Sequence, residues 1–593
     1  MSVSLSATCI RSIPMVDRIT ALVVKDSLEA ISEEMSKTVE RTAVHPLFNE
    51  VHDYSTGVFF YDGSNVRLVA RATAIPVHIF ASILSVEALM NTFRDDLHEG
   101  DIVMLNDPYY GGTHHADWTV MKPVFFEGKP VLFPSVRAHM ADFGGPVAGG
   151  YNPEAKDIWQ EALRIPPIKL FEKGVLRHDI LEWILANSRI PNVLRGDLAA
   201  MFGACNLAEQ RIRALFTKYG GEVVNESIEY TLDYAEKRFR AEVAKWPDGV
   251  YEATSTLDHD SQGTHDLQVK ATVTINGSDL SVDFAGSSPE TPGFVNSPFG
   301  NTASWVFTAL CAVLPEDIPV NSGVFRAVKI TAPEGTVVNP LPPAPCMFST
   351  VVIGGDVGTA TMRALAQAVP EKAGAVSLNY CLCTTYGHDS RYNSMFVTIE
   401  YGNTLVAASG TRGCDGWGGW PAPMCGLIYS TVEMSEIQFP FRYHQYEYVS
   451  DTAAPGQWRG VPGFAMKRES VRDTSILNVA LTGVRHTSPG FAGGKDGASS
   501  RYVLNWGTDH EEEVLESAAN RPSPPGTIIA TFKGGGGGWG DPFARDPHKV
   551  LDDVLDEHVS IEQAEKQYGV VIDQHTLKLD IEETIRCRAR MAK

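Results

Sequence analysis

Two apolar runs separated by a short turn are the feature that most restricts how this chain can fold. Residues 119–126 (TVMKPVFF) and 131–138 (VLFPSVRA) flank Glu127-Gly128-Lys129-Pro130, a glycine-containing connection typical of a β-hairpin. Facing strands of a hairpin share their two faces, so residues at the outer ends of both runs become neighbours although they are distant in the chain. Whatever stands at those ends is expected to form one site.

A His-x-x-Asp motif stands at each outer end, at residues 114–117 and 139–142. With a three-residue loop, Asp117 lies directly opposite His139 on the same face of the hairpin. With a four-residue loop, Trp118 lies opposite His139 instead, because a shift of one residue turns every side chain to the other face. The sequence leaves both registers open, and only the first unites the two motifs.

Imidazole and carboxylate side chains in this pattern indicate a metal site. Together they suit zinc, manganese or iron, and they argue against copper(I) or an iron–sulfur cluster. A single histidine is more often a hydrogen-bonded structural residue, but two motifs joined by one hairpin favour metal binding. We predict that His114, Asp117 and His139 hold a divalent metal, zinc or manganese or else iron. Asp142 and His115 are expected to support these ligands through hydrogen bonds.

Other polar residues are candidates for a general base or for contact with a substrate. Each of them also has an ordinary structural interpretation. We take as catalytic candidates Asp53, Glu161 and Asp142, and as candidates for contact with substrate or support of the ligands His115, Arg137, His78 and Arg164.

Length and charge limit the class of protein. A chain of 593 residues is too long for a single core, so several domains are expected. The net charge of -22 repels nucleic-acid phosphates and anionic lipid surfaces. No apolar stretch approaches the roughly 20 residues that span a bilayer, and the first residues do not have the pattern of a secretory leader. We therefore expect neither nucleic acid nor membrane as a partner, and a cytoplasmic location.

The distribution of elements predicts a multidomain α+β fold with mixed sheets and an N-terminal helical and hairpin metal-binding region. Helices are expected at 17–42, about 79–97 and, with interruptions at glycines, 178–245; short strands are expected over 249–338. We predict an N-terminal metal-binding catalytic region over 1–245, a β-rich domain over 246–345, and a C-terminal α/β region with glycine-rich loops and a helical tail over 346–593. The glycine run at 534–538 lacks the Gly-Lys-Ser/Thr of a phosphate-binding loop and predicts a mobile or closely packed loop.

Several motifs resemble those of the hydantoinase B/oxoprolinase family. The resemblance begins with Asn106-Asp-Pro-Tyr-Tyr-Gly-Gly-Thr-His114, Asp117 and Arg137-Ala-His139-x-x-Asp142. It continues along nearly the whole chain, with Glu161-x-x-Arg164-Ile-Pro-Pro167, Asp283-Phe-x-Gly-Ser-Ser, Val432-Glu-x-x-Glu436, Asp451-Thr-x-x-x-Gly-x-x-Arg-Gly460 and Gly535-Gly-Gly-Gly-Trp-Gly-Asp-Pro542.

The resemblance implies a partner and a reaction. In this family a hydantoinase A-type subunit or domain uses ATP to phosphorylate a carbonyl or enol oxygen, and the B-type subunit completes the reaction at its metal. By resemblance to acetone carboxylase, the metal-binding positions fall on His114, Asp117 and His139. The expected assembly is a heterotetramer or larger.

The residues between the first two ligands leave the substrate open. His115-Ala116 stand where Leu-Pro is common in the family. In length the chain resembles stand-alone hydantoinase B subunits and lacks the extension of acetone carboxylase, and this resemblance favours a subunit that opens a hydantoin, an oxoproline-like ring or a lactam with a metal-activated water. The alternatives are a ketone carboxylase of the acetone or acetophenone type and a non-catalytic structural subunit.

Overall fold

The computed structural model of the protein describes residues 16–591 except 74, 375–378, 401–407 and 418–426. The first 15 residues, on which the expected absence of a leader rested, lie outside this range. The chain forms two compact units, one of residues 1–252, 269–357 and 424–429, the other of residues 253–268, 358–423 and 430–593. The predicted multidomain α+β class is confirmed. The three-part division at residues 245 and 345 stays a prediction.

The first unit contains a sheet with the strand order β2-β1-β6-β4-β3-β7-β8, and β5 pairs with β6 outside this path. The central strands β3 and β4 are buried along their whole length, as expected for a sheet covered on both faces. The strands are β1 (Tyr54–Tyr61), β2 (Val66–Arg71), β3 (Ile102–Leu105), β4 (Asp117–Met121), β5 (Val124–Phe126), β6 (Lys129–His139), β7 (Ile168–Glu172) and β8 (Val175–Leu176).

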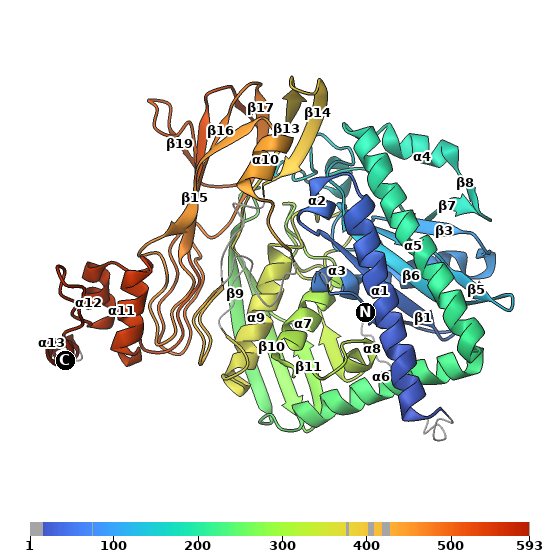
Figure 1. Ribbon diagram of the computed structural model, residues 1–593, viewed down its shortest axis with the longest axis horizontal. Helices are drawn as coiled ribbons and strands as arrows, with labels where there is room; N and C mark the ends of the chain where they lie inside the picture. The colour runs from blue at the N-terminus through green and yellow to red at the C-terminus, as the bar shows by residue number, and fades with distance from the viewer. Residues whose placement is uncertain (1–15, 74, 375–378, 401–407, 418–426, 592–593) are drawn as a thin grey trace. The chain divides into compact units, whose positions relative to one another are not determined.

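Helices cover both faces of this sheet (Figure 1). On one face lie α1 and α5, and the Thr56 hydroxyl of β1 donates a hydrogen bond to the Ser32 carbonyl of α1. On the other face lies α3, and Ser55 of β1 donates to the Ile75 carbonyl just before that helix. Alternate residues of one strand therefore face different helices. The helices are α1 (Arg18–Thr42), α2 (Pro46–Asn49), α3 (Pro76–Phe93), α4 (His178–Leu185), α5 (Pro191–Tyr219), α6 (Gly221–Val243), α7 (Phe299–Val313) and α8 (Ser322–Phe325).

Local sequence signals explain where α1 begins and where α5 ends. The Asp17 carboxylate accepts hydrogen bonds from the backbone N–H groups of Ile19 and Thr20, which caps α1 as predicted. Of the expected glycine interruptions, only Gly220 separates two helices, with φ +80°, whereas Gly196 and Gly203 lie inside α5.

The short strands expected over 249–338 occur, but the helices α7 and α8, which were not expected, lie in the same segment. Helix α7 (FGNTASWVFTALCAV) is apolar or small on every side and is almost entirely buried. A helix without a polar face shows no amphipathic period, so periodicity cannot separate it from a buried strand. The same segment contains a second sheet in the order β12-β11-β10-β9, with β9 (Gly249–His259), β10 (His265–Asn276), β11 (Asp279–Asp283) and β12 (Val328–Thr331).

One helical stretch, Pro76–Asp96, is long and apolar enough to cross a membrane by length and composition. Within the first unit this helix, α3, packs on strands of the large sheet and on α7, where the Phe80 and Phe307 rings meet at 6.1 Å between centroids. It is therefore a core helix, and its apolar composition follows from contact on several sides.

The second unit contains two antiparallel sheets, ordered β14-β13-β17-β20 and β15-β16-β21-β18-β19. The glycine run at 534–538 follows β21 and is closely packed: a Cβ added at Gly534 would lie 1.7 Å from the Ala498 carbonyl, and one at Gly537 would lie 2.0 Å from that of Pro489. The elements are α9 (Ile353–Ala368), β13 (Cys381–Asp389), β14 (Ser394–Ile399), α10 (Val432–Gln438), β15 (Phe441–Val449), β16 (Gly463–Ser470), β17 (Ser475–Leu481), β18 (Arg501–Leu504), β19 (Glu512–Val514), β20 (Ala518–Ser523), β21 (Ile528–Lys533), α11 (Pro547–Leu555), α12 (Ile561–Tyr568) and α13 (Ile581–Met591).

Candidate metal centre

The hairpin brings the two His-x-x-Asp motifs together in the predicted register. Strands β4 and β6 pair with Asp117 directly opposite His139. Neither of the two loop lengths considered occurs, because Lys129 already pairs with Phe126 and only residues 127–128 form the turn, both with positive φ. An irregularity next to Val124 inserts one extra residue into β6 and restores the register toward the site.

Three side chains form a buried group that can hold a metal ion: His114, Asp117 and His139. Asp117 Oδ1 lies 2.9 Å from His114 Nε2 and 3.4 Å from His139 Nδ1. All three side chains are at least 96 % buried. The second Asp117 oxygen accepts a short hydrogen bond from the Thr113 hydroxyl, which fixes the carboxylate.

The backbone determines the tautomer of His114. Its Nδ1 lies 2.7 Å from the Met347 carbonyl oxygen and must donate there, because a carbonyl only accepts. Nε2 lies 2.9 Å from Asp117 Oδ1; it donates a hydrogen bond there when it carries a proton, and it offers its lone pair where a metal ion replaces that proton. Burial alone would lower the pKa of His114, but the charge and hydrogen bond of Asp117 outweigh this and raise the pKa. Burial likewise opposes ionisation of Asp117, yet His114 and His78 hold its pKa well below the usual range.

Asp53 and His78 complete the polar cluster. Asp53 directly precedes β1, and its Oδ2 lies 3.9 Å from His139 Nδ1. His78, in the first turn of α3, places Nε2 3.2 Å from Asp117 Oδ2 and 3.8 Å from Asp53 Oδ1. Two carboxylates and three imidazoles thus converge in a buried space between α3 and the sheet.

These residues fit a divalent metal. Buried charges are normally paired or bound to metal, and here two carboxylates face imidazole nitrogens. Within the described part of the chain, His139 Nε2 and His78 Nδ1 are buried nitrogens without a hydrogen-bond partner. Mixed nitrogen and carboxylate ligands at this spacing are those that zinc and manganese accept.

Four of the other predicted site residues, Asp142, Arg164, His115 and Glu161, have polar partners outside the group of His114, Asp117 and His139. Asp142 binds Arg189, whose Nη1 donates at 2.8 Å, and burial raises the pKa of Asp142 despite that partner. Arg164 donates a short hydrogen bond to Asp107. His115 lies 3.2 Å from Glu161 through its Nδ1, and both side chains are fully buried.

Arg137 stands two residues before His139 in β6, so both side chains lie on the same face of the sheet, the face toward α3. Its Nη2 is 3.5 Å from the Ser85 hydroxyl, and burial lowers the pKa of its guanidinium to about 10. Asp117 is the nearby charge that opposes this decrease. Arg137 therefore partly balances the negative charge of the cluster.

Two residues at the centre could not be found from sequence motifs. The Tyr151 ring stacks on His139 at 6.3 Å between centroids, with 15° between the planes. Met347 acts through its backbone carbonyl, 233 residues from His114 in the chain. The glycines at 149–150 before Tyr151 are a weak signal for the first, and a carbonyl contact leaves no signal in a side-chain motif.

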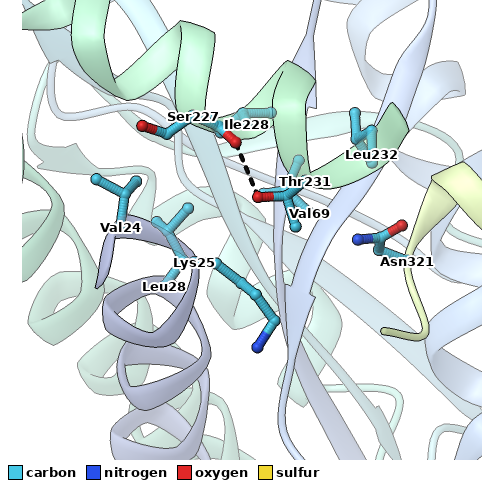
Figure 2. Close-up of a pocket in the computed structure, with 9 residues that line it drawn as sticks. All are labelled: Val24, Lys25, Leu28, Val69, Ser227, Ile228, Thr231, Leu232 and Asn321. Carbon is cyan, nitrogen blue, oxygen red and sulfur yellow. Dashed lines mark hydrogen bonds between the residues drawn. The ribbon is translucent and has the colours of Figure 1, made fainter. Parts of the chain in front are cut away.

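A small pocket elsewhere in this unit holds none of the predicted site residues (Figure 2). It lies among α1, α6 and β2, and its lining includes Val24, Leu28, Val69 and Leu232. The one charged residue there, Lys25, is paired with Asp26 and Glu29 in α1. The rest of the lining includes the uncharged polar residues Ser227, Thr231 and Asn321, so the pocket offers no group of metal-binding side chains.

Known proteins resemble this chain along nearly its whole length. The model of the hydantoinase B/oxoprolinase family matches residues 17–542. The beta subunit of the caprolactamase of Pseudomonas jessenii is 34 % identical over 94 % of this chain and 97 % of its own. A putative B-type subunit of the D-/L-hydantoinase of Pseudomonas sp. (strain NS671) is 30 % identical over 97 % and 98 %.

A solved structure and a more distant relative are also similar to this chain. A crystal structure of the ATP-dependent caprolactamase from Pseudomonas jessenii has a TM-score of 0.88 and 32 % identity, covering 97 % of this chain and 100 % of its own. The delta subunit of the acetophenone carboxylase of Aromatoleum aromaticum is 25 % identical over 86 % of this chain and 81 % of its own.

Proposed function

Because this chain belongs to the hydantoinase B/oxoprolinase family, we propose that it is the B-type subunit of an ATP-dependent enzyme that opens a cyclic amide. The observation that carries the proposal is the end-to-end likeness to a caprolactamase subunit and to a hydantoinase subunit. The substrate class is a lactam, a hydantoin or an oxoproline-like ring. The buried group of His114, Asp117 and His139 supports the proposal, because its donor set suits a hydrolytic metal.

The chemistry follows from the stability of an amide. An unstrained ring amide reacts slowly with water, and phosphorylation of its carbonyl oxygen by a hydantoinase A-type partner, which consumes ATP, would make the ring carbon more electrophilic. Water would add to that carbon and the ring nitrogen would leave as an amine. Hydrolysis of the resulting acyl phosphate would then release phosphate and the amino acid. A divalent metal bound by His114, Asp117 and His139 would supply a water of lowered pKa. Asp53 lies within 4 Å of His139 and is positioned to accept the proton of an attacking water.

Carboxylation is the second candidate, favoured by the likeness to an acetophenone carboxylase subunit. In that case the partner would phosphorylate an enol oxygen and bicarbonate, and His114, Asp117 and His139 would hold a metal against the enolate. Both candidates use the same buried residues, so the substrate rather than the site separates them.

The discriminating experiment incubates this chain and its A-type partner with ATP and either a cyclic amide or a ketone plus bicarbonate. We expect ADP and the ring-opened amino acid to form together, with no dependence on bicarbonate. ATP consumption that requires bicarbonate and a ketone would replace the hydrolase by a carboxylase. Reactions without the partner are the control for contaminating hydrolases.

The proposal includes a cytoplasmic hetero-oligomer, with two or more copies of each subunit. A passed phosphorylated intermediate would hydrolyse in free solution, so the two active sites should lie in one assembly. Native mass measurement of the co-expressed subunits tests this. A lone monomer of this chain beside the free partner would contradict it.

A further inference from the structure

Glu161 lies behind the candidate metal centre without touching any of its three ligands. It follows the 3-10 turn Ile158–Gln160, and its side chain is fully buried. One carboxylate oxygen accepts a hydrogen bond from the Met347 backbone N–H at 2.7 Å. The other lies 3.2 Å from His115 Nδ1. Glu161 therefore joins the loop of the ligands to the segment around residue 347.

Met347 connects Glu161 to a ligand. Its N–H is held by Glu161, and its carbonyl accepts from His114 Nδ1 at 2.7 Å. A ring nitrogen that donates to a fixed carbonyl leaves the other nitrogen unprotonated and sets the plane of the ring. The position of the Met347 backbone therefore determines whether His114 presents Nε2 toward Asp117 in the form that binds metal.

Other hydrogen bonds also hold this segment, but the acceptor of the Met347 N–H is Glu161. The Phe348 N–H donates to the Phe294 carbonyl at 2.9 Å, and the Ser349 hydroxyl donates to the Thr113 carbonyl at 2.9 Å. Before Met347, the Pro345 carbonyl accepts from Asn296 Nδ2 at 3.0 Å. The segment is therefore attached on both sides, and loss of the Glu161 acceptor would free the Met347 peptide to reorient while the rest of the segment stays attached.

From this geometry we infer that Glu161 is a positioning residue for the metal centre: through the Met347 backbone it holds His114 in the metal-binding tautomer and orientation. This inference rests on the proposed metal centre and assigns Glu161 no contact with substrate. The carboxylate is needed as a hydrogen-bond acceptor for an N–H group, and its charge is not.

The test measures the dissociation constant of Zn²⁺ or Mn²⁺ in competition with a chelator, on the full chain. Glu161→Met keeps the size of the side chain but removes the acceptor, and we expect metal affinity to fall about 10- to 100-fold, the usual effect of losing a residue that orients a ligand. Glu161→Gln keeps an oxygen that can accept from Met347, and its affinity should stay within about threefold of the unaltered protein.

Asp197→Leu is the matched control. Asp197 is also a buried carboxylate that accepts backbone N–H bonds, from Val44 and His45, in the same unit. Its loss should change metal affinity by less than about threefold, because it supports no ligand. A fall in affinity equal to that of Glu161→Met would show a general effect of destabilisation and overturn the inference.

The outcomes separate this inference from the metal centre itself. If the unaltered protein binds no metal, both fail. If it binds metal and Glu161→Met binds equally well, only the positioning role fails. Should Glu161→Met not fold, Glu161→Gln still decides: a folded Gln variant that loses metal more than about tenfold would mean that the charge matters, and the inference would be wrong.

Discussion

Replacing His139 by alanine tests the hairpin register and the metal centre together. His139 reaches the first motif only because β4 and β6 pair with Asp117 opposite His139. Loss of a residue that merely supports a ligand already costs about 10- to 100-fold in metal affinity. Loss of one of three protein ligands should therefore cost more than about 100-fold, or more than about 2.8 kcal/mol at 1.4 kcal/mol per factor of ten.

The assay is elemental analysis of the purified protein together with product formation alongside the A-type partner. We expect His139→Ala to lose stoichiometric metal and ring opening, while ATP consumption by the partner, if it runs uncoupled, continues. The control is His178→Ala. His178 lies exposed at the start of α4, outside both motifs, and should keep full metal content.

Folding must be measured on the same samples. Circular dichroism and thermal unfolding should show that His139→Ala remains folded, because the backbone bond from His139 N–H to the Asp53 carbonyl does not need the side chain. A folded variant with full metal content and full product formation would refute the ligand assignment and the location of the site together.

Two further predictions concern stability. Burial raises the pKa of Asp197 from 3.8 to about 6, even though the backbone N–H groups of Val44 and His45 donate to its carboxylate. The folded protein therefore holds this proton more tightly than the unfolded chain, and the free energy of unfolding falls as the pH rises between about 4 and 6. Asp197→Asn keeps a hydrogen-bond acceptor without the charge. Its free energy of unfolding should exceed that of the unaltered protein by an amount that grows over this pH range toward about 3 kcal/mol, at 1.36 kcal/mol per pKa unit. A difference that does not depend on pH would show that ionisation of Asp197 is not its cause. Gly537→Ala places a Cβ 2.0 Å from the Pro489 carbonyl and should cost about 1 to 3 kcal/mol or more. Gly203 lies inside α5, where an added Cβ would have no atom from outside the helix backbone within 4 Å, so Gly203→Ala should instead stabilise the protein by about 0.5 to 1 kcal/mol. Thermal unfolding of both variants measures the difference.

The sequence was most informative where local chemistry acts alone. The carboxylate of Asp17 caps α1 as predicted, and the apolar runs form the predicted hairpin. Of the two registers that the sequence left open, the one that places Asp117 opposite His139 occurs, although the turn is shorter than either loop considered. An extra residue in β6 compensates for the shorter turn, and no signal in the sequence marks such an insertion.

Tertiary structure decided what the sequence did not show. Helix α7 has apolar or small residues on all sides because the first unit surrounds it, so its period was hidden. Asp142 matches Asp117 in its motif but binds Arg189 instead of joining the ligand group. The Met347 carbonyl supports His114 from a distant segment, and its role depends on backbone position rather than residue type. The sequence marked Glu161 as a catalytic candidate, but it did not show that its carboxylate accepts from the Met347 N–H.

The most direct test of the metal centre is X-ray diffraction from crystals of the protein, recorded at the absorption edges of zinc, manganese and iron. We predict one strong anomalous peak within about 2.0 to 2.3 Å of a ligand atom of His114, Asp117 and His139. The edge at which the peak appears identifies the metal. A stoichiometric peak at any other place in the chain, or none at these three residues in protein that opens its substrate, would contradict the account.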